Sequence, residues 1–207
     1  MLKIGVMVSG GGTNLQAILD KINNGALTDC QIVTVVSSNP SAFALERARK
    51  NNIPAKVISR KNFSSIEDYD DAILAHMRSH DVQLVVLAGF LSQLGEKFVN
   101  AYKNAIINVH PSLIPSFCGK GYYGLIPHIK ALEYGVKITG ATVHFVELDY
   151  DSGPIILQKA VEVLPGDTPE TLQKRVMEQA EWEILPEAIK LFSQKRLKVN
   201  GRLVEIL

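Results

Sequence analysis

The chain of 207 residues is long enough for one α/β domain, and its 46% hydrophobic and 21% charged residues are typical of a globular protein. A formal net charge of +1 gives no bulk electrostatic attraction to nucleic acid or to an anionic membrane. The two cysteines, Cys30 and Cys118, are far apart, which argues against a zinc knuckle or redox pair and for a reducing compartment. The N-terminal apolar run breaks at Ser9-Gly10, too early for a secretion signal or a membrane span, so we expect a cytoplasmic protein.

The first half of the chain alternates short β-rich runs with helical patterns. Strands are expected over 2–8, 31–37, 55–59, 83–90 and 105–110. Helices are expected from about residue 13, over 41–52 and 65–80, and around 95–102. We expect Thr13 or Asn14 to cap the first of these helices. Repeated β-α-β units predict an α/β fold with a doubly wound, mostly parallel sheet.

The second half changes character, beginning with a loop rich in Gly, Pro and aromatic residues over 111–127. A short helix near 127–134, two β-rich runs over 137–147 and 154–163, and a long helix over 168–192 are expected to follow. The two runs predict antiparallel strands, and Asn200-Gly201 predicts the turn of a hairpin over 197–206. We therefore expect a single domain over 1–207, with a nucleotide-binding half at 1–110 and the loop, antiparallel strands, long helix and hairpin in 111–207.

A glycine-rich segment, "VSGGGTNLQAI", follows the first strand and opens the first helix. Glycines let backbone N–H groups approach an anion closely, and a helix N-terminus favours negative charge. The spacing is not that of a dinucleotide fingerprint, because Leu15 stands where the last glycine belongs, and no Gly-Lys-Ser/Thr of a P-loop follows. The segment predicts a small phosphate site, with a merely tight strand–helix turn as the alternative.

Asn108 and His110 lie two residues apart where a buried strand ends at Pro111, so their side chains share one face. Ligands of open α/β sheets bind at this edge. Asp149 and Asp151, in the turn between the two later strands, offer a carboxylate for the imidazole. An amide, an imidazole and a carboxylate suit acyl transfer, although a strand-end histidine can also be hydrogen-bonded scaffolding.

The remaining histidines give weaker signals. His76 and His80 share a helix face without a third ligand, so no metal site is predicted. His128 is expected to be structural or at the rim of the site, and His144 is expected near the same end of the sheet.

Six motifs occur in order along the chain: "VSGGGTNLQAI", "SSNPSAFALERA", "VVLAGFL", "INVHPSLIPSF", "GATVHFVELDYDSGPIILQ" and "GDTPETLQKRV". Together they resemble the phosphoribosylglycinamide formyltransferase family over about residues 2–192. The resemblance implies a formyltransferase-type, Rossmann-like fold. It also implies transfer of a formyl group from 10-formyltetrahydrofolate to the amino group of N1-(5-phospho-D-ribosyl)glycinamide in purine biosynthesis, without a metal.

The resemblance also assigns residues. The family's catalytic residues fall on Asn108, His110 and Asp151, but not on Asp149. Asn108 would bind the formyl oxygen as it becomes an oxyanion, and His110 would act in its charged form. The remaining assignments are Gly12, Thr13 and Asn14 for the phosphate, Leu91, Ser92, Gln93 and Leu94 with Asn108 for the folate, Val146 beside the pterin, and Glu181 for the ribose. Glu181 lies within a stretch, "AEWEILP", in which the chain carries one more residue than the family pattern.

Two alternatives differ in chemistry. A formyltetrahydrofolate hydrolase shares the Asn-x-His and Asp pattern but is usually preceded by a regulatory domain, whereas the first strand here starts at residue 2. A non-catalytic nucleotide-binding module would not need the three catalytic residue types. We expect small-molecule partners, neither nucleic acid nor membrane, and a monomer or homodimer.

Overall fold

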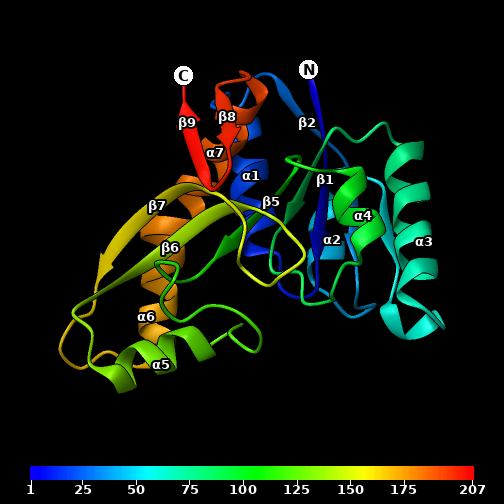
Figure 1. The fold of residues 1–207 in the computed structure, drawn as a ribbon. Coiled ribbons are helices and arrows are strands. Elements are labelled where there is room, and N and C mark those ends of the chain that lie inside the picture. The colour runs from blue at the N-terminus through cyan, green and yellow to red at the C-terminus, as the bar shows by residue number, and fades with distance from the viewer. The chain divides into compact units, whose positions relative to one another are not determined.

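The computed structural model describes residues 1–207, which form two compact units, Met1–Ile107 and Asn108–Leu207 (Figure 1). The first unit contains, in chain order, β1 (Leu2–Val8), α1 (Thr13–Asn23), β2 (Cys30–Ser37), α2 (Ala44–Lys50), β3 (Ala55–Val57), the 3₁₀ turn η1 (Arg60–Asn62), α3 (Ile66–Ser79), β4 (Leu84–Leu87) and α4 (Glu96–Ala101). Every strand and helix predicted for this half is present, although β3 and β4 are shorter than expected.

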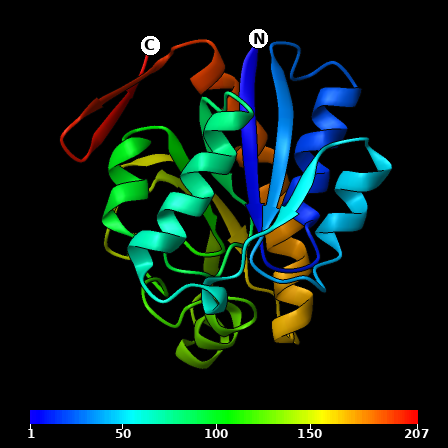
Figure 2. The same ribbon diagram turned by 90° about the vertical axis from the view of Figure 1, so that its right-hand side faces the viewer.

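The strands of the first unit are parallel and lie in the order β3-β2-β1-β4. The chain therefore winds outward from β1 to β3 and then crosses back to β4. Because such crossovers are right-handed, α1 and α2 cover one face of these strands and α3 and α4 the other (Figure 2). The winding reverses between β1 and β4, and the carboxyl ends of strands at such a switch point are where α/β sheets bind ligands.

The expectation that Thr13 or Asn14 caps α1 is wrong. The N-cap is Gly12, whose φ of 71° is in the left-handed region, and no side-chain cap is formed. A Cβ at Gly12 would lie 2.6 Å from the Cβ of Ala44, so only glycine fits where α2 approaches this loop.

The strand β5 (Ile106–His110) carries the chain into the second unit. There follow α5 (Ile126–Tyr134), β6 (Ile138–Phe145), β7 (Ile155–Glu162), α6 (Pro169–Val176), the π-helical turn η2 (Met177–Glu181), α7 (Trp182–Ser193), β8 (Leu197–Asn200) and β9 (Leu203–Ile206). β6 and β7 pair antiparallel, with a bulge between Val143 and His144. The predicted fold class, α/β with a mostly parallel sheet and antiparallel strands in the C-terminal half, is confirmed.

Two predictions for this unit need correction. The long helix over 168–192 is interrupted by η2, which packs against β6 and β7. The hairpin turn is Gly201-Arg202 rather than Asn200-Gly201, because Asn200 still pairs with Leu203. Gly201, with a φ of 59°, takes the first central position, where a positive φ is needed.

Candidate active site

The first unit brings two predicted binding segments together at its switch point. The glycine loop follows β1, and the segment containing Leu91–Leu94 follows β4, the strand beside it. The Ser9 N–H donates to the Gly89 carbonyl at 3.1 Å, and the Leu91 N–H donates to Ser9 Oγ at 2.9 Å. Ser9 Oγ also lies 2.6 Å from Ser38 Oγ, after β2. The two segments are therefore hydrogen-bonded to each other.

Arg47 adds a positive charge to the glycine loop, which the sequence reasoning did not anticipate. Its Nε donates to the Gly11 carbonyl at 2.8 Å, and its Nη1 donates to Gln16 Oε1 at 2.8 Å. A guanidinium and the N-terminus of α1 both favour a bound anion. The surroundings of Gly12, Thr13 and Asn14 therefore suit a phosphate.

The segment after β4 is fixed by a buried carboxylate. Asp70, only 1% exposed, accepts the N–H groups of Gly95 at 2.9 Å and Phe98 at 3.0 Å. A Cβ at Gly95 would lie 2.5 Å from Asp70 Oδ2, so glycine is needed at this close approach. Asp70 therefore holds the end of the segment Leu91–Leu94, at whose start Leu91 is 58% exposed.

In the second unit, the carboxylate of Asp151 connects Asn108 and His110, the polar residues at the end of β5. Asp151 Oδ2 lies 3.4 Å from His110 Nδ1, and Oδ1 lies 3.5 Å from Asn108 Nδ2. The turn that carries Asp151 is tight, because the Phe145 N–H bonds the Pro154 carbonyl and Gly153 leaves no space for a Cβ beside the Phe145 carbonyl. The predicted triad is thus brought together.

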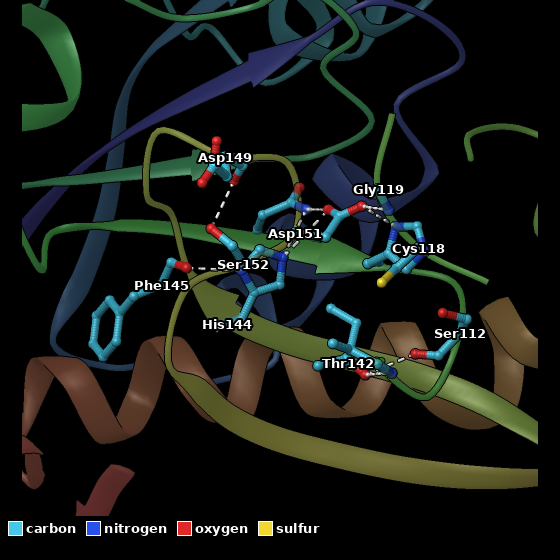
Figure 3. A network of polar contacts seen from close by, with 12 residues as sticks. Ser112, Cys118, Gly119, Thr142, His144, Phe145, Asp149, Asp151 and Ser152 are labelled. Carbon is cyan, nitrogen blue, oxygen red and sulfur yellow. Dashed lines mark hydrogen bonds and ion pairs between the residues drawn. The ribbon is translucent and has the colours of Figure 1, made fainter. Parts of the chain in front are cut away.

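Asp149, the other carboxylate of this turn, is linked to Ser152 rather than to the side chains of the triad (Figure 3). It is exposed, and its backbone carbonyl accepts the hydroxyl of Ser152. The preference for Asp151 over Asp149 agrees with this arrangement.

The loop after β5 contacts the triad through its backbone. His110 Nε2 donates to the Phe117 carbonyl at 2.9 Å, and the Gly119 N–H donates to Asp151 Oδ2 at 2.8 Å. Thr142 on β6 fixes the start of the loop, because its hydroxyl donates to the Ser112 carbonyl at 2.7 Å and accepts the Ile114 N–H at 3.1 Å. Backbone contacts of this kind leave no sequence motif.

Burial and charge act in opposite directions on the triad. Burial lowers the pKa of His110, and the Asp151 charge and the Phe117 carbonyl only partly oppose it. Burial raises the pKa of Asp151, but the two imidazoles and the Gly119 N–H outweigh it, so the carboxyl pKa is lowered. The site therefore favours a carboxylate beside a neutral imidazole near neutral pH, whereas we expected a charged His110.

His144 joins this network, as its predicted position near the site suggested. It is 1% exposed, and its Nε2 lies 3.2 Å from Asn108 Nδ2 and 3.6 Å from Asp151 Oδ1 (Figure 3). His144 is two residues from Thr142 on β6, so the sequence could have indicated that both side chains lie on the same face of the strand. It could not have indicated the contacts of His144 with Asn108 and Asp151.

The other predicted residues of the second unit are Val146, Glu181 and His128. Val146 is half-buried at the start of the turn after β6, and Glu181 is buried at the end of η2. His128 is fully buried in α5, where burial and then the charge of His110 lower its pKa to about 4.

No three His, Cys, Asp or Glu side chains are grouped so that they could hold a metal ion. His76 Nε2 instead lies 2.8 Å from Thr34 Oγ1, and its ring lies 4.5 Å from that of His80. None of the helices has both the length and the apolar character needed to cross a membrane.

Comparison with known proteins gives consistent results. The family model described as formyl transferase matches residues 2–189. Phosphoribosylglycinamide formyltransferase of Haemophilus influenzae is 40% identical over 203 residues, which cover 98% of this chain and 92% of that protein.

Solved structures of two kinds are similar to the chain. Glycinamide ribonucleotide transformylase 1 from Symbiobacterium toebii has a TM-score of 0.93 at 43% identity, covering 100% of this chain and 94% of the other. A formyltetrahydrofolate deformylase from Pseudomonas syringae has a TM-score of 0.87 at 26% identity, covering 100% of this chain and 66% of the other.

Proposed function

Because the chain belongs to the formyl transferase family, we propose that it transfers the formyl group of 10-formyltetrahydrofolate to the amino group of N1-(5-phospho-D-ribosyl)glycinamide. The observation that carries the proposal is the network of Asn108, His110 and Asp151 in a chain 40% identical to a phosphoribosylglycinamide formyltransferase. The proposal includes a place in purine biosynthesis, small-molecule partners and a cytoplasmic location.

Two segments of the first unit are proposed to bind the substrates. The glycine loop, with Gly12, Thr13 and Asn14, receives the phosphate of the ribonucleotide, and Arg47 adds a compensating charge. The segment of Leu91, Ser92, Gln93 and Leu94 contacts the folate. In the second unit, Asn108 and Val146 contribute to the folate site, and Glu181 hydrogen-bonds the ribose.

The second unit is proposed to supply the catalytic groups. The substrate amine attacks the formyl carbon, forming a C–N bond while the carbonyl oxygen becomes an oxyanion. An N–H of Asn108 stabilises that oxygen. The C–N bond to the folate then breaks, and the folate nitrogen takes up a proton to give tetrahydrofolate.

His110 is suited to accept the proton that the attacking amine loses. Its Nε2–H is directed at the Phe117 carbonyl, so Nδ1 is the nitrogen that can take up a proton, next to Asp151 Oδ2. The lowered pKa keeps the resting imidazole neutral, and the carboxylate stabilises the imidazolium once it forms. His110 therefore acts as a base that becomes charged during the reaction.

The test is release of tetrahydrofolate from 10-formyltetrahydrofolate, measured with and without the ribonucleotide. We expect release that requires the ribonucleotide and falls about 10²–10⁴-fold in His110→Ala. Release without the ribonucleotide would instead identify a hydrolase, the activity named for the similar deformylase structure. Binding of both ligands by folded protein without turnover would identify a non-catalytic module.

A further inference from the structure

His144 lies on β6 beside the catalytic triad, where the pairing with β7 is irregular. Val143 pairs with Leu157 and His144 with Ile155, so the unpaired extra residue is Ile156 of β7. Irregularities of this kind are frequent next to active sites. β6 itself carries no extra residue, and His144 is held by its side-chain contacts.

The hydrogen bonds of His144 define its tautomer. Nδ1 lies 2.7 Å from the Phe145 carbonyl oxygen, which can only accept, so Nδ1 carries a hydrogen. In the neutral ring Nε2 is then a bare acceptor, and Asn108 Nδ2 lies 3.2 Å from it.

The geometry around Asn108 Nδ2 leaves one of its two N–H groups for a ligand. Its neighbours, His144 Nε2 at 3.2 Å and Asp151 Oδ1 at 3.5 Å, are 3.6 Å apart and therefore subtend about 65° at Nδ2. The two N–H bonds of an amide diverge by about 120°, so one N–H directed between both acceptors satisfies them at these long distances. The second N–H then points away from both.

We propose that His144 is a positioning residue that fixes the amide of Asn108, so that the N–H not shared with His144 and Asp151 meets the developing oxyanion. Two acceptors on one side also keep the amide from turning its carbonyl oxygen toward them, because that oxygen would face the Asp151 carboxylate. His144 itself does not contact the reacting atoms. The role rests on the formyl transfer proposed above.

The test compares two substitutions of His144. The amide oxygen of Gln is three bonds from Cβ, as Nε2 of histidine is, so His144→Gln keeps an acceptor for Asn108. His144→Leu keeps a side chain of similar volume but removes the acceptor. Loss of a complete oxyanion donor costs about 10²–10³ in kcat. We expect a fall of about 10–100-fold for Leu and within about fivefold for Gln, with both KM values changed by less than about threefold.

The same His144 substitutions in an Asn108→Ala protein separate positioning from general structural support. If His144 acts through Asn108, His144→Leu lowers kcat by less than about twofold in that background. An equal loss in both backgrounds would overturn the proposal, as would full activity of His144→Leu or equal damage by Gln and Leu. The unsubstituted enzyme is the reference, because absence of ribonucleotide-dependent turnover there would refute the function rather than the role of His144. If the Leu variant fails to fold, the kcat of His144→Gln is compared in the native and Asn108→Ala backgrounds, and an equal loss in both overturns the proposal.

Discussion

Asp151 has an unfavourable backbone conformation at the centre of the polar network. Its φ of 52° lies in the left-handed region, which costs a non-glycine residue about 1–2 kcal/mol. The carboxylate meets Gly119, His110, His144 and Asn108 within 3.6 Å. Strain retained where a side chain makes this many polar contacts is typical of functional sites.

Replacing Asp151 by Asn tests the role of its charge. The variant keeps the shape but cannot stabilise an imidazolium at His110, so we expect kcat to fall about 10²–10⁴-fold. Steady-state release of tetrahydrofolate measures the change. Asp149→Asn is the matched control, because its exposed carboxylate lies outside the network, and its kcat should stay within about twofold. Equal losses in the two variants would contradict the assignment.

Strand alternation and the position of a turn are local properties of the sequence, and they placed Asn108 and His110 on one face and offered Asp149 and Asp151 as the carboxylate. The family resemblance then selected Asp151. The contacts that orient them could not be predicted. His144 is 36 positions from Asn108, and the Phe117 contact uses a backbone carbonyl that any residue could provide.

At the scale of secondary structure, η2 explains how Glu181 remains buried. Buried positions are four residues apart at Leu172, Val176 and Ala180, and Glu181, five residues after Val176, is buried as well. In a continuous α-helix a step of five would turn Glu181 about 140° away from Val176. The wider π turn absorbs one residue, so the buried faces of α6 and α7 both stay in register.

Deletion of Gln179, an exposed residue of η2, should therefore be tolerated. Removing one residue converts the π turn into α-helix and keeps both buried faces in place. We expect the free energy of unfolding to change by about 1 kcal/mol or less, and the KM for the ribonucleotide by less than about threefold. Urea denaturation and steady-state kinetics provide the two measurements.

Deletion of Glu187, also exposed but within α7, is the matched control. It would rotate Ala188, Ile189 and Leu191 by about 100° out of the core, and we expect a loss of more than about 3 kcal/mol. If the two deletions destabilise equally, η2 is not the place where the chain accommodates an additional residue.

The helices and strands followed from hydrophobic periodicity, but their interruptions did not. The pattern over 168–192 looks continuous because α6, η2 and α7 all bury apolar residues. The start of α1 near residue 13 followed from the sequence, but its N-cap did not. The close approach of Ala44 to Gly12 joins distant segments and has no local signature.

At the scale of the whole molecule, burial of His128 makes stability depend on pH. Its pKa is lowered to about 4 in the folded protein and is about 6.5 in an unfolded chain. Below pH about 6.5 the unfolded chain therefore binds a proton that the folded protein does not, and the free energy of unfolding falls by about 1.4 kcal/mol per pH unit until about pH 4. Above that window His128 contributes no pH dependence.

Comparison with His128→Leu isolates this contribution. Between pH 7.5 and 5.0 the native protein should lose about 2 kcal/mol more stability than the variant, as measured by urea denaturation at each pH. His76, whose pKa is also lowered to about 4, acts equally in both proteins and cancels. Parallel stability curves would show that the folded protein accommodates a charged His128.

The hydroxyl of Ser9 has a consequence for how the two substrates bind. It joins the segments after β1, β2 and β4, and two of these are the proposed phosphate and folate sites. A ligand that orders one segment lowers the entropic cost of ordering the other, and such cooperativity is reciprocal. We expect tetrahydrofolate and the ribonucleotide to raise each other's affinity by the same factor in calorimetric titrations, and Ser9→Ala to reduce that factor. If neither ligand changes the affinity of the other, the hydrogen bonds of Ser9 do not couple the two binding sites.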